Sequence, residues 1–193
     1  MEQQQDLEKR ISRDLDGISP MRQAFDRCFL SVLSTTMVAL PGRWLLVANV
    51  LNGAILAGAV LVPLMMAAGL QPVAGALFAA YHVICQQNPD HSYFLMGYQL
   101  AMDQRMVAIY AATLAAGLIF APVRDRVRPL RWRTYFLLIL PIAIDGLTQL
   151  FGWRHSNWEL RTTTGALFGM ATVWLAYPHI ERALRSPLVG WRG

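Results

Sequence analysis

The stretch from Phe136 to Trp153 reads FLLILPIAIDGLTQLFGW and holds one charged residue, Asp145. Its length is close to that of a membrane-crossing helix, which needs about 20 mostly apolar residues. A charge in the hydrocarbon core of a bilayer costs roughly 3 kcal/mol on insertion scales, and it therefore requires a partner or a wet cavity. The stretch predicts a membrane protein that holds a polar group among its helices.

The composition of the whole chain agrees with a membrane protein. Hydrophobic residues make up 55% of the 193 residues and charged residues 15%, whereas a soluble domain carries about 25% charged residues. The net charge is +5, but the basic residues lie in short segments between apolar runs, as in membrane loops, and do not indicate nucleic-acid binding. Cys28 and Cys85 are too few and too far apart to form a disulfide framework.

Four apolar runs are long enough to cross a membrane. They are 44–70, 101–123, 135–153 and 162–180. The run from Val73 to Cys85 is shorter, and we expect it to form a half-helix or a surface helix. The predicted fold is all-α, a polytopic membrane protein with about four transmembrane helices in residues 44–183 and a cytoplasmic tail at 184–193.

Residues 1–43 are predicted to form an amphipathic arm in the membrane interface. Apolar residues recur at helical spacing in this arm, with charged residues on the other faces, and the helical pattern is expected to end near Pro41-Gly42. The alternative is that residues 28–40 begin a further span. That run is short for one.

The basic residues predict the orientation in the membrane. The connection between the second and third runs carries Arg124, Arg126, Arg128, Arg131 and Arg133, whereas residues 71–100 hold no Lys or Arg. The positive-inside rule then places both termini in the cytoplasm, with the protein crossing the bacterial inner membrane several times. The same basic loop has the charge to bind anionic lipid.

This orientation places several polar residues at the same depth in the membrane, near its outer side. Asp145 and Gln149 lie in the outer half of the third run, Asp103 and Arg105 near the outer end of the second, and Arg161 at the start of the fourth. We expect Asp145 to pair with Arg105 or with Arg161. Such a pair is a structural device that fixes helix packing, or it marks a ligand, quinone-headgroup or proton site.

Small residues at helical spacing predict close packing of the spans. Gly165 and Gly169 have the spacing of a small-xxx-small motif. The pattern does not distinguish packing within the chain from packing with another subunit.

Several short motifs resemble those of a prokaryotic membrane-protein family, domain of unknown function 2085. The family pattern is Cys-His-Gln-x-Pro-x-Arg-Ser-Phe, then Gly-x-Gln-Leu, then Cys-x-Arg-Cys-x-Gly-Ile-Tyr, followed by Pro-x-x-Ile-Asp-Gly-x-Thr-Gln and Arg-x-x-Thr-Gly. The corresponding segments here are CQQNPDHSYF at 85–94, GYQL at 97–100, Arg105 with Ile109-Tyr110, PIAIDGLTQ at 141–149, and Arg161 with Thr164-Gly165. The resemblance covers about residues 73–169.

The departures from this pattern bear on the chemistry. Gln86 stands where the family has His, and Asp103 and Met106 stand where it has two cysteines. The family pattern would supply soft metal ligands or redox thiols, whereas one thiol, one carboxylate and one thioether make a poor zinc site. The remnant of the motif is Cys85, Gln86, Pro89, Gln99 and Tyr110. The four histidines lack metal-ligand spacing, and we expect no metal and no cofactor.

These observations favour a non-catalytic accessory subunit of a larger membrane complex, with respiratory or photosynthetic assemblies as candidates. Its expected partners are membrane lipids and other membrane-protein subunits. Two alternatives remain open from the sequence. One is a small membrane-embedded redox or metal-dependent enzyme that uses Cys85 and the Asp145 cluster, and the other is a transporter or proton pathway through Asp145.

Overall fold

The computed structural model describes residues 20–153 and 156–185, and of residues 20–42 it describes the backbone alone. The chain divides into two units, Met1–Arg43 and Trp44–Gly193. In the described part of the first unit the backbone is helical from Pro20. The proposed interfacial position of the arm and the last eight residues of the predicted tail fall outside the described residues.

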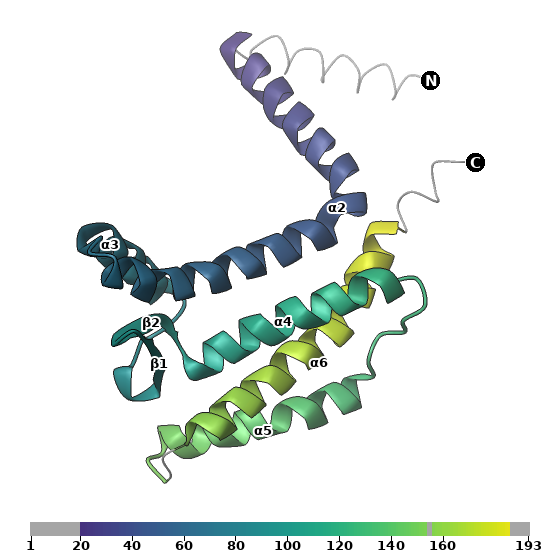
Figure 1. The fold of residues 1–193 in the computed structure, drawn as a ribbon. Helices are drawn as coiled ribbons and strands as arrows, with labels where there is room; N and C mark the ends of the chain where they lie inside the picture. The colour runs from purple at the N-terminus through teal and green to yellow at the C-terminus, as the bar shows by residue number, and fades with distance from the viewer. Residues whose placement is uncertain (1–19, 154–155, 186–193) are drawn as a thin grey trace, which may run out of the picture. The chain divides into compact units, whose positions relative to one another are not determined.

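The described elements are mostly helices, with one hairpin between them (Figure 1). In chain order they are α2 (Pro20–Ala67), α3 (Gln71–Ala80), η1 (Tyr81–Val83), η2 (Pro89–His91), β1 (Ser92–Leu95), β2 (Tyr98–Asp103), α4 (Gln104–Val123), α5 (Trp132–Leu150) and α6 (Trp158–Arg185).

Two of the described helical segments are both long enough and apolar enough to cross a membrane, Arg43–Ala67 within α2 and the whole of α4. α5 and α6 have the length but carry polar residues among their apolar ones. The prediction of a mainly helical protein with membrane-length apolar helices is confirmed. The count of four spans is not confirmed by this criterion.

One predicted helix boundary is wrong. α2 continues through Pro41-Gly42, where the sequence pattern indicated an end. A proline inside a helix removes one backbone hydrogen bond but does not always end the helix. The apolar sequence resumes within two residues of Gly42.

The second correction is a short hairpin in a chain predicted to be all-α. β1 and β2 pair antiparallel, with Phe94 opposite Gln99 and an irregularity between Ser92 and Phe94. The turn residues Met96 and Gly97 have φ of 54° and 82°, the left-handed conformation that a two-residue hairpin turn requires. The helix predicted from residue 101 therefore begins at Gln104.

The helices α4 and α5 both pack along α6 (Figure 1). A Cβ atom added at Gly165 would lie 2.7 Å from the carbonyl oxygen of Arg105, and one added at Gly169 would lie 2.6 Å from that of Ile109. The small-residue face of α6 is therefore used within the chain, against α4.

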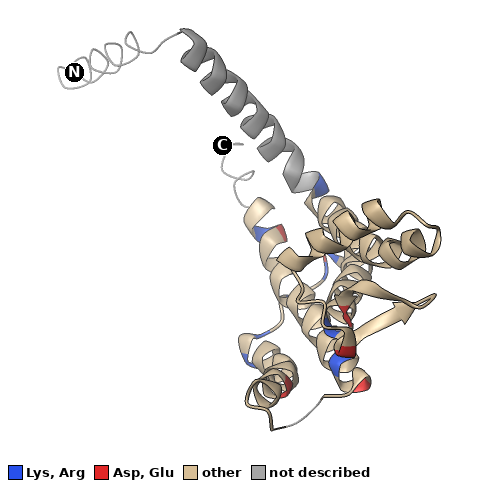
Figure 2. Ribbon diagram, turned by 90° about the vertical axis from the view of Figure 1, so that its left-hand side faces the viewer, with Lys and Arg blue, Asp and Glu red and all other residues tan. Residues whose placement is uncertain are grey.

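Two apolar clusters hold the second unit together. One joins α2, α4 and α6, and it contains Trp44, Leu45, Ala116, Phe120, Val173 and Tyr177. The other joins α2 to the loop and hairpin, and it contains Ala59, Val62, Cys85, Ala101 and Met102. Charged residues are sparse along the helices between their ends (Figure 2).

Candidate functional site

Asp145 is the buried residue of α5, with 2% of its surface exposed. Its carboxylate forms an ion pair with Nη2 of Arg105 in the first turn of α4. Gln149 lies one turn after Asp145 on the same face of α5 and donates its Nε2 to Asp145 Oδ2 at 2.8 Å. The acid therefore has partners on its own helix and on a neighbouring one.

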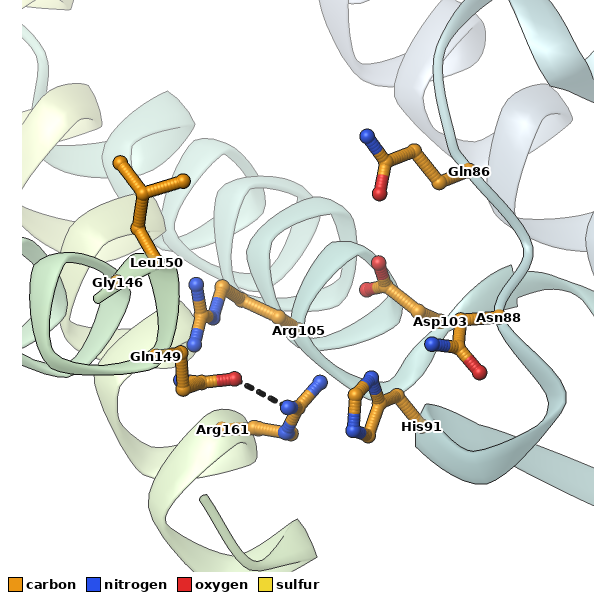
Figure 3. Close-up of a pocket in the computed structure, with 9 residues that line it drawn as sticks. All are labelled: Gln86, Asn88, His91, Asp103, Arg105, Gly146, Gln149, Leu150 and Arg161. Atoms are coloured by element: carbon orange, nitrogen blue, oxygen red, sulfur yellow. Dashed lines mark hydrogen bonds between the residues drawn. The ribbon is translucent and has the colours of Figure 1, made fainter. Parts of the chain in front are cut away.

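Arg161 extends this network to a third helix. It lies in the first turn of α6, is 5% exposed, and donates Nη2 to Gln149 Oε1 (Figure 3). Its Nε donates to the carbonyl of Ser156 at 3.3 Å. We name Arg105, Asp145, Gln149 and Arg161 the polar cluster. Its bonds connect the beginning of α4, the end of α5 and the beginning of α6.

Asp103, which the sequence analysis grouped with these residues, has other partners. Its Oδ1 accepts from the backbone N–H of Met106 at 2.7 Å and so caps the N-terminus of α4. Its Oδ2 accepts from the thiol of Cys85 at 3.5 Å. Within the described residues, the cluster's ion pair is formed by Arg105 and Asp145.

The thiol of Cys85 is buried. Its sulfur also accepts the backbone N–H groups of Gln87 at 3.4 Å and Asp103 at 3.3 Å. Burial raises the pKa of the Cys85 thiol above its ordinary value, and the nearby carboxylate of Asp103 adds to this effect. A reactive cysteine needs a lowered pKa and access to solvent, so this geometry does not favour thiol chemistry.

Gln87 is a structural residue that the sequence reasoning did not single out. It is 4% exposed, and its Nε2 donates to the carbonyls of Phe78 at 2.7 Å and Ala101 at 2.9 Å. Gln99 of β2 in turn donates its Nε2 to the Gln87 carbonyl at 2.7 Å. These bonds fasten the loop between α3 and the hairpin. The available signal was the position of Gln87 directly after Cys85-Gln86 in the family-like motif.

The loop and the polar cluster together line a cavity of about 320 Å³ that is open on one side (Figure 3). It is lined by Gln86, Asn88, His91, Asp103, Arg105, Gly146, Gln149, Leu150 and Arg161. The hairpin is fastened to α6 by a 2.6 Å hydrogen bond between the hydroxyls of Tyr93 and Thr162. Asn88 and His91 were not predicted to lie at this site, because the hairpin brings their loop to the helix ends. Gly146 and Leu150 each follow a residue of the polar cluster on α5.

The other predicted residues lie apart from the cluster. Pro89 begins η2, Gln99 supports the loop, and Tyr110 packs against the second apolar cluster. The basic loop follows the opposite end of α4, and its side chains are exposed except that of Arg124, which is half-buried. In the described part of the chain no three His, Cys, Asp or Glu residues are grouped so that they could hold a metal ion.

The comparison with known proteins agrees with the resemblance seen in the motifs. Residues 85–175 match the model of a family described as predicted membrane protein, domain of unknown function 2085. A protein of Methanocaldococcus jannaschii, named only as uncharacterized, is 37% identical over 105 residues, which are 53% of this chain and 67% of that protein. The chain belongs to this family.

A second relative, an uncharacterized protein of Methanothermobacter thermautotrophicus, is 28% identical over 102 residues, which are 52% of this chain and 92% of that protein. No solved structure matches the chain. The family match begins at Cys85, ends in α6 and contains the whole polar cluster. The family region of this chain therefore coincides with the hairpin and the three helices α4, α5 and α6.

The positions at which this chain differs from the family pattern lie close together in the fold. Cys85 contacts Asp103, and Asp103 caps the helix turn that contains Met106. The positions at which the family pattern has cysteines therefore lie around one point, and this chain keeps one thiol there. The arginines, the acid and the glutamine of the polar cluster match the pattern.

Proposed function

We propose that this chain is a non-catalytic accessory subunit of a larger complex in the cytoplasmic membrane. The proposal is supported by the observation that the polar residues shared with the family pattern bond one element of the chain to another. Arg105 pairs with Asp145 and Arg161 bonds to Gln149 across helices, and Gln87 and Gln99 bond the loop to the hairpin. These side chains serve the architecture, while the thiol of Cys85 is buried and protonated.

Four membrane spans form part of the proposal. Besides the two apolar segments, α5 has 19 residues and α6 has 28, which correspond to about 28 Å and 42 Å of helix. The ionisable residues that they carry at the level of the polar cluster, Asp145 and Arg161, are buried in bonds to other helices. Internal pairing of this kind is how transmembrane helices accommodate ionisable residues.

The orientation is proposed from the distribution of arginines. The exposed basic loop connects the end of α4 to the beginning of α5, and the positive-inside rule places it in the cytoplasm with both termini. The polar cluster lies at the other ends of these helices. It would therefore face the outer side of the membrane.

The proposed contact surface for a partner subunit is the outward face of α5. Its exposed side chains are large and apolar, among them Phe136, Leu137, Leu140, Ile144 and Leu147. The glycine face of α6 is already covered by α4 and does not remain for a partner. The alternative occupant of the α5 face is lipid.

Gentle detergent extraction of a tagged chain tests the subunit proposal. We expect other membrane proteins to co-purify in fixed ratio, and to be lost when Leu137 and Ile144 are replaced by Trp while the chain itself stays folded. The matched control is the same replacement of Leu64 on α2, which is also exposed. A chain that elutes as a lone monomer in several mild detergents contradicts the proposal.

The architectural role of the polar cluster is tested by Asp145→Asn. The change leaves the guanidinium of Arg105 without its carboxylate, and breaking a buried ion pair from one side costs about 3 kcal/mol or more. We expect reduced abundance in the membrane and a lower unfolding temperature, while Asp90→Asn, which alters an exposed carboxylate, has no effect. Normal abundance combined with a loss of ion or substrate flux would instead favour the transport alternative.

A further inference from the structure

No carboxylate among the described residues forms a hydrogen bond or contact ion pair with the guanidinium of Arg161, although those of Asp145 and Asp103 lie near enough to attract it. Its two bonds go to neutral acceptors, the side-chain oxygen of Gln149 and the carbonyl of Ser156. The carboxylate of Asp145 pairs with Arg105, and that of Asp103 accepts from Met106 and Cys85. Arg161 is 95% buried, since 5% of its surface is exposed. A buried cation without a counter-ion in direct contact is unfavourable, and the nearby charge of Arg105 adds to the cost.

A second guanidinium faces the same cavity. Arg105 lines it together with Arg161, and the buried Nε atom of Arg105 has no hydrogen-bond partner. The two cations approach from different helices, α4 and α6 (Figure 3). Each retains N–H groups beyond those used for Asp145 and Gln149, and the planar guanidinium fork suits the oxygens of carboxylate and phosphate groups.

The rest of the lining can donate hydrogen bonds to the oxygens of such a group. Gln86 and Asn88 contribute amides, which donate through their nitrogens. His91 contributes an imidazole whose pKa is lowered by burial and by the nearby Arg161, so that at neutral pH it is uncharged and can donate one N–H. Asp103 is the acidic group in the lining, and its charge is directed to the N-terminus of α4, where the helix dipole stabilises it.

The volume of the cavity limits the ligand. About 320 Å³ is at the lower end of the range for small-molecule sites, which is about 300–1,000 Å³. The lining is polar except for Gly146 and Leu150. We propose that this cavity binds one oxyanion group, a phosphate or a carboxylate, that serves as the counter-ion of Arg161 and is shared with Arg105. The group belongs either to a lipid headgroup or to a small soluble acid.

This inference does not depend on the accessory-subunit proposal, because it concerns the chain alone. It is tested on the purified full chain in a neutral detergent at constant ionic strength. In one arm inorganic phosphate and succinate are titrated against the protein, with binding measured by calorimetry and by the shift of the unfolding temperature. In the other arm the chain is reconstituted with phosphatidylglycerol or with phosphatidylcholine, and retained lipid is identified by native mass spectrometry.

We expect saturable binding in at least one arm, and that arm identifies the source of the oxyanion. Arg161→Gln should weaken the binding at least tenfold, whereas Arg126→Gln in the exposed basic loop should leave it unchanged. Arg161→Gln also removes a bond to α5 and could therefore act through a loss of stability. A second variant separates loss of binding from loss of stability. Gln86→Glu changes an exposed side chain and places a carboxylate in the lining, and it should weaken binding by a similar factor without lowering the unfolding temperature of the free protein.

The outcomes separate clearly. Binding that is lost in both cavity variants and kept in the loop variant supports the site. Absence of saturable binding in both arms overturns it, and so does binding that Arg161→Gln and Gln86→Glu leave intact. Titration with sodium chloride at matched ionic strength excludes a general effect of salt on exposed charges.

Discussion

At the scale of single residues, the charged groups of this chain could be located from the sequence better than the neutral ones. An acid within an apolar run needs a partner, and the order of the spans restricts that partner to arginines at the same level of the membrane. In the structure Arg105 holds Asp145, and Arg161 reaches Gln149. The choice between the two arginines depends on helix rotation, which the sequence pattern does not determine.

Gln87 shows the opposite case. A glutamine in a polar loop has no periodic signal, and its burial follows from the path of the loop between α3 and the hairpin. That path places its Nε2 between two backbone carbonyls, those of Phe78 and Ala101. The lining residues Asn88 and His91 were inaccessible to prediction for the same reason, because the positions of loop residues follow from tertiary structure.

Replacing Gln87 with Leu tests this role. The variant leaves two backbone carbonyls without their donor, and an unsatisfied buried polar group costs about 1–3 kcal/mol. We expect the unfolding temperature in detergent to fall by about 2–12 °C, since 1 kcal/mol corresponds to about 2–4 °C in a chain of this size. The control is Gln86→Leu at the neighbouring exposed position, and equal effects of the two changes would contradict the assignment.

At the scale of elements, hydrophobic run length located the helices α4, α5 and α6 to within a few residues. The hairpin was missed because its strands adjoin a long apolar run, and short apolar segments do not distinguish strand from helix. The Met96-Gly97 pair was the local signal for the turn. The end of a helix at Pro41-Gly42 was wrongly inferred, since α2 is continuous through both residues and a Pro-Gly pair makes a helix end more frequent without requiring one.

The contact between α4 and α6 gives a prediction at this scale. In Gly169→Ala the new Cβ would lie 2.6 Å from the carbonyl of Ile109 and 3.2 Å from Ala112 Cβ, so the two helix backbones must separate. We expect a loss of about 1–3 kcal/mol in the free energy of unfolding, as for other overpacked contacts. Chemical unfolding in mixed micelles, followed by the fluorescence of the tryptophans, measures it.

The matched control is Gly75→Ala in α3, where an added Cβ meets no atom within 4 Å. In an uncrowded helix this change is stabilising by up to about 1 kcal/mol. Opposite signs for the two variants are therefore expected. A neutral Gly169→Ala would show that α4 and α6 pack less closely than the structure indicates.

At the scale of the whole molecule, residues that bond the helices to one another also make α5 resemble a membrane span less closely. α5 and α6 fall short in apolar character. α5 carries Asp145 and Gln149 of the polar cluster, whereas α6 carries Thr162–Thr164 after Arg161 and His179 near its other end. Hydropathy treats each side chain as if it faced lipid, whereas Asp145 and Arg161 are buried in bonds. The four-span topology must therefore be tested by accessibility from each side of the membrane.

Single cysteines introduced into a variant with both native cysteines replaced by serine provide this test. Asp90 in the loop beside the cavity and Arg128 in the basic loop are both exposed, and α4 separates them in the chain. If the basic loop is cytoplasmic, a membrane-impermeant maleimide added to intact cells or spheroplasts should label Asp90→Cys at once. It should label Arg128→Cys only after permeabilisation. Labelling of both positions from outside would remove α4 as a span, and the reverse pattern would place the polar cluster and its cavity on the cytoplasmic side, where the oxyanion would come from the inner leaflet or the cytosol.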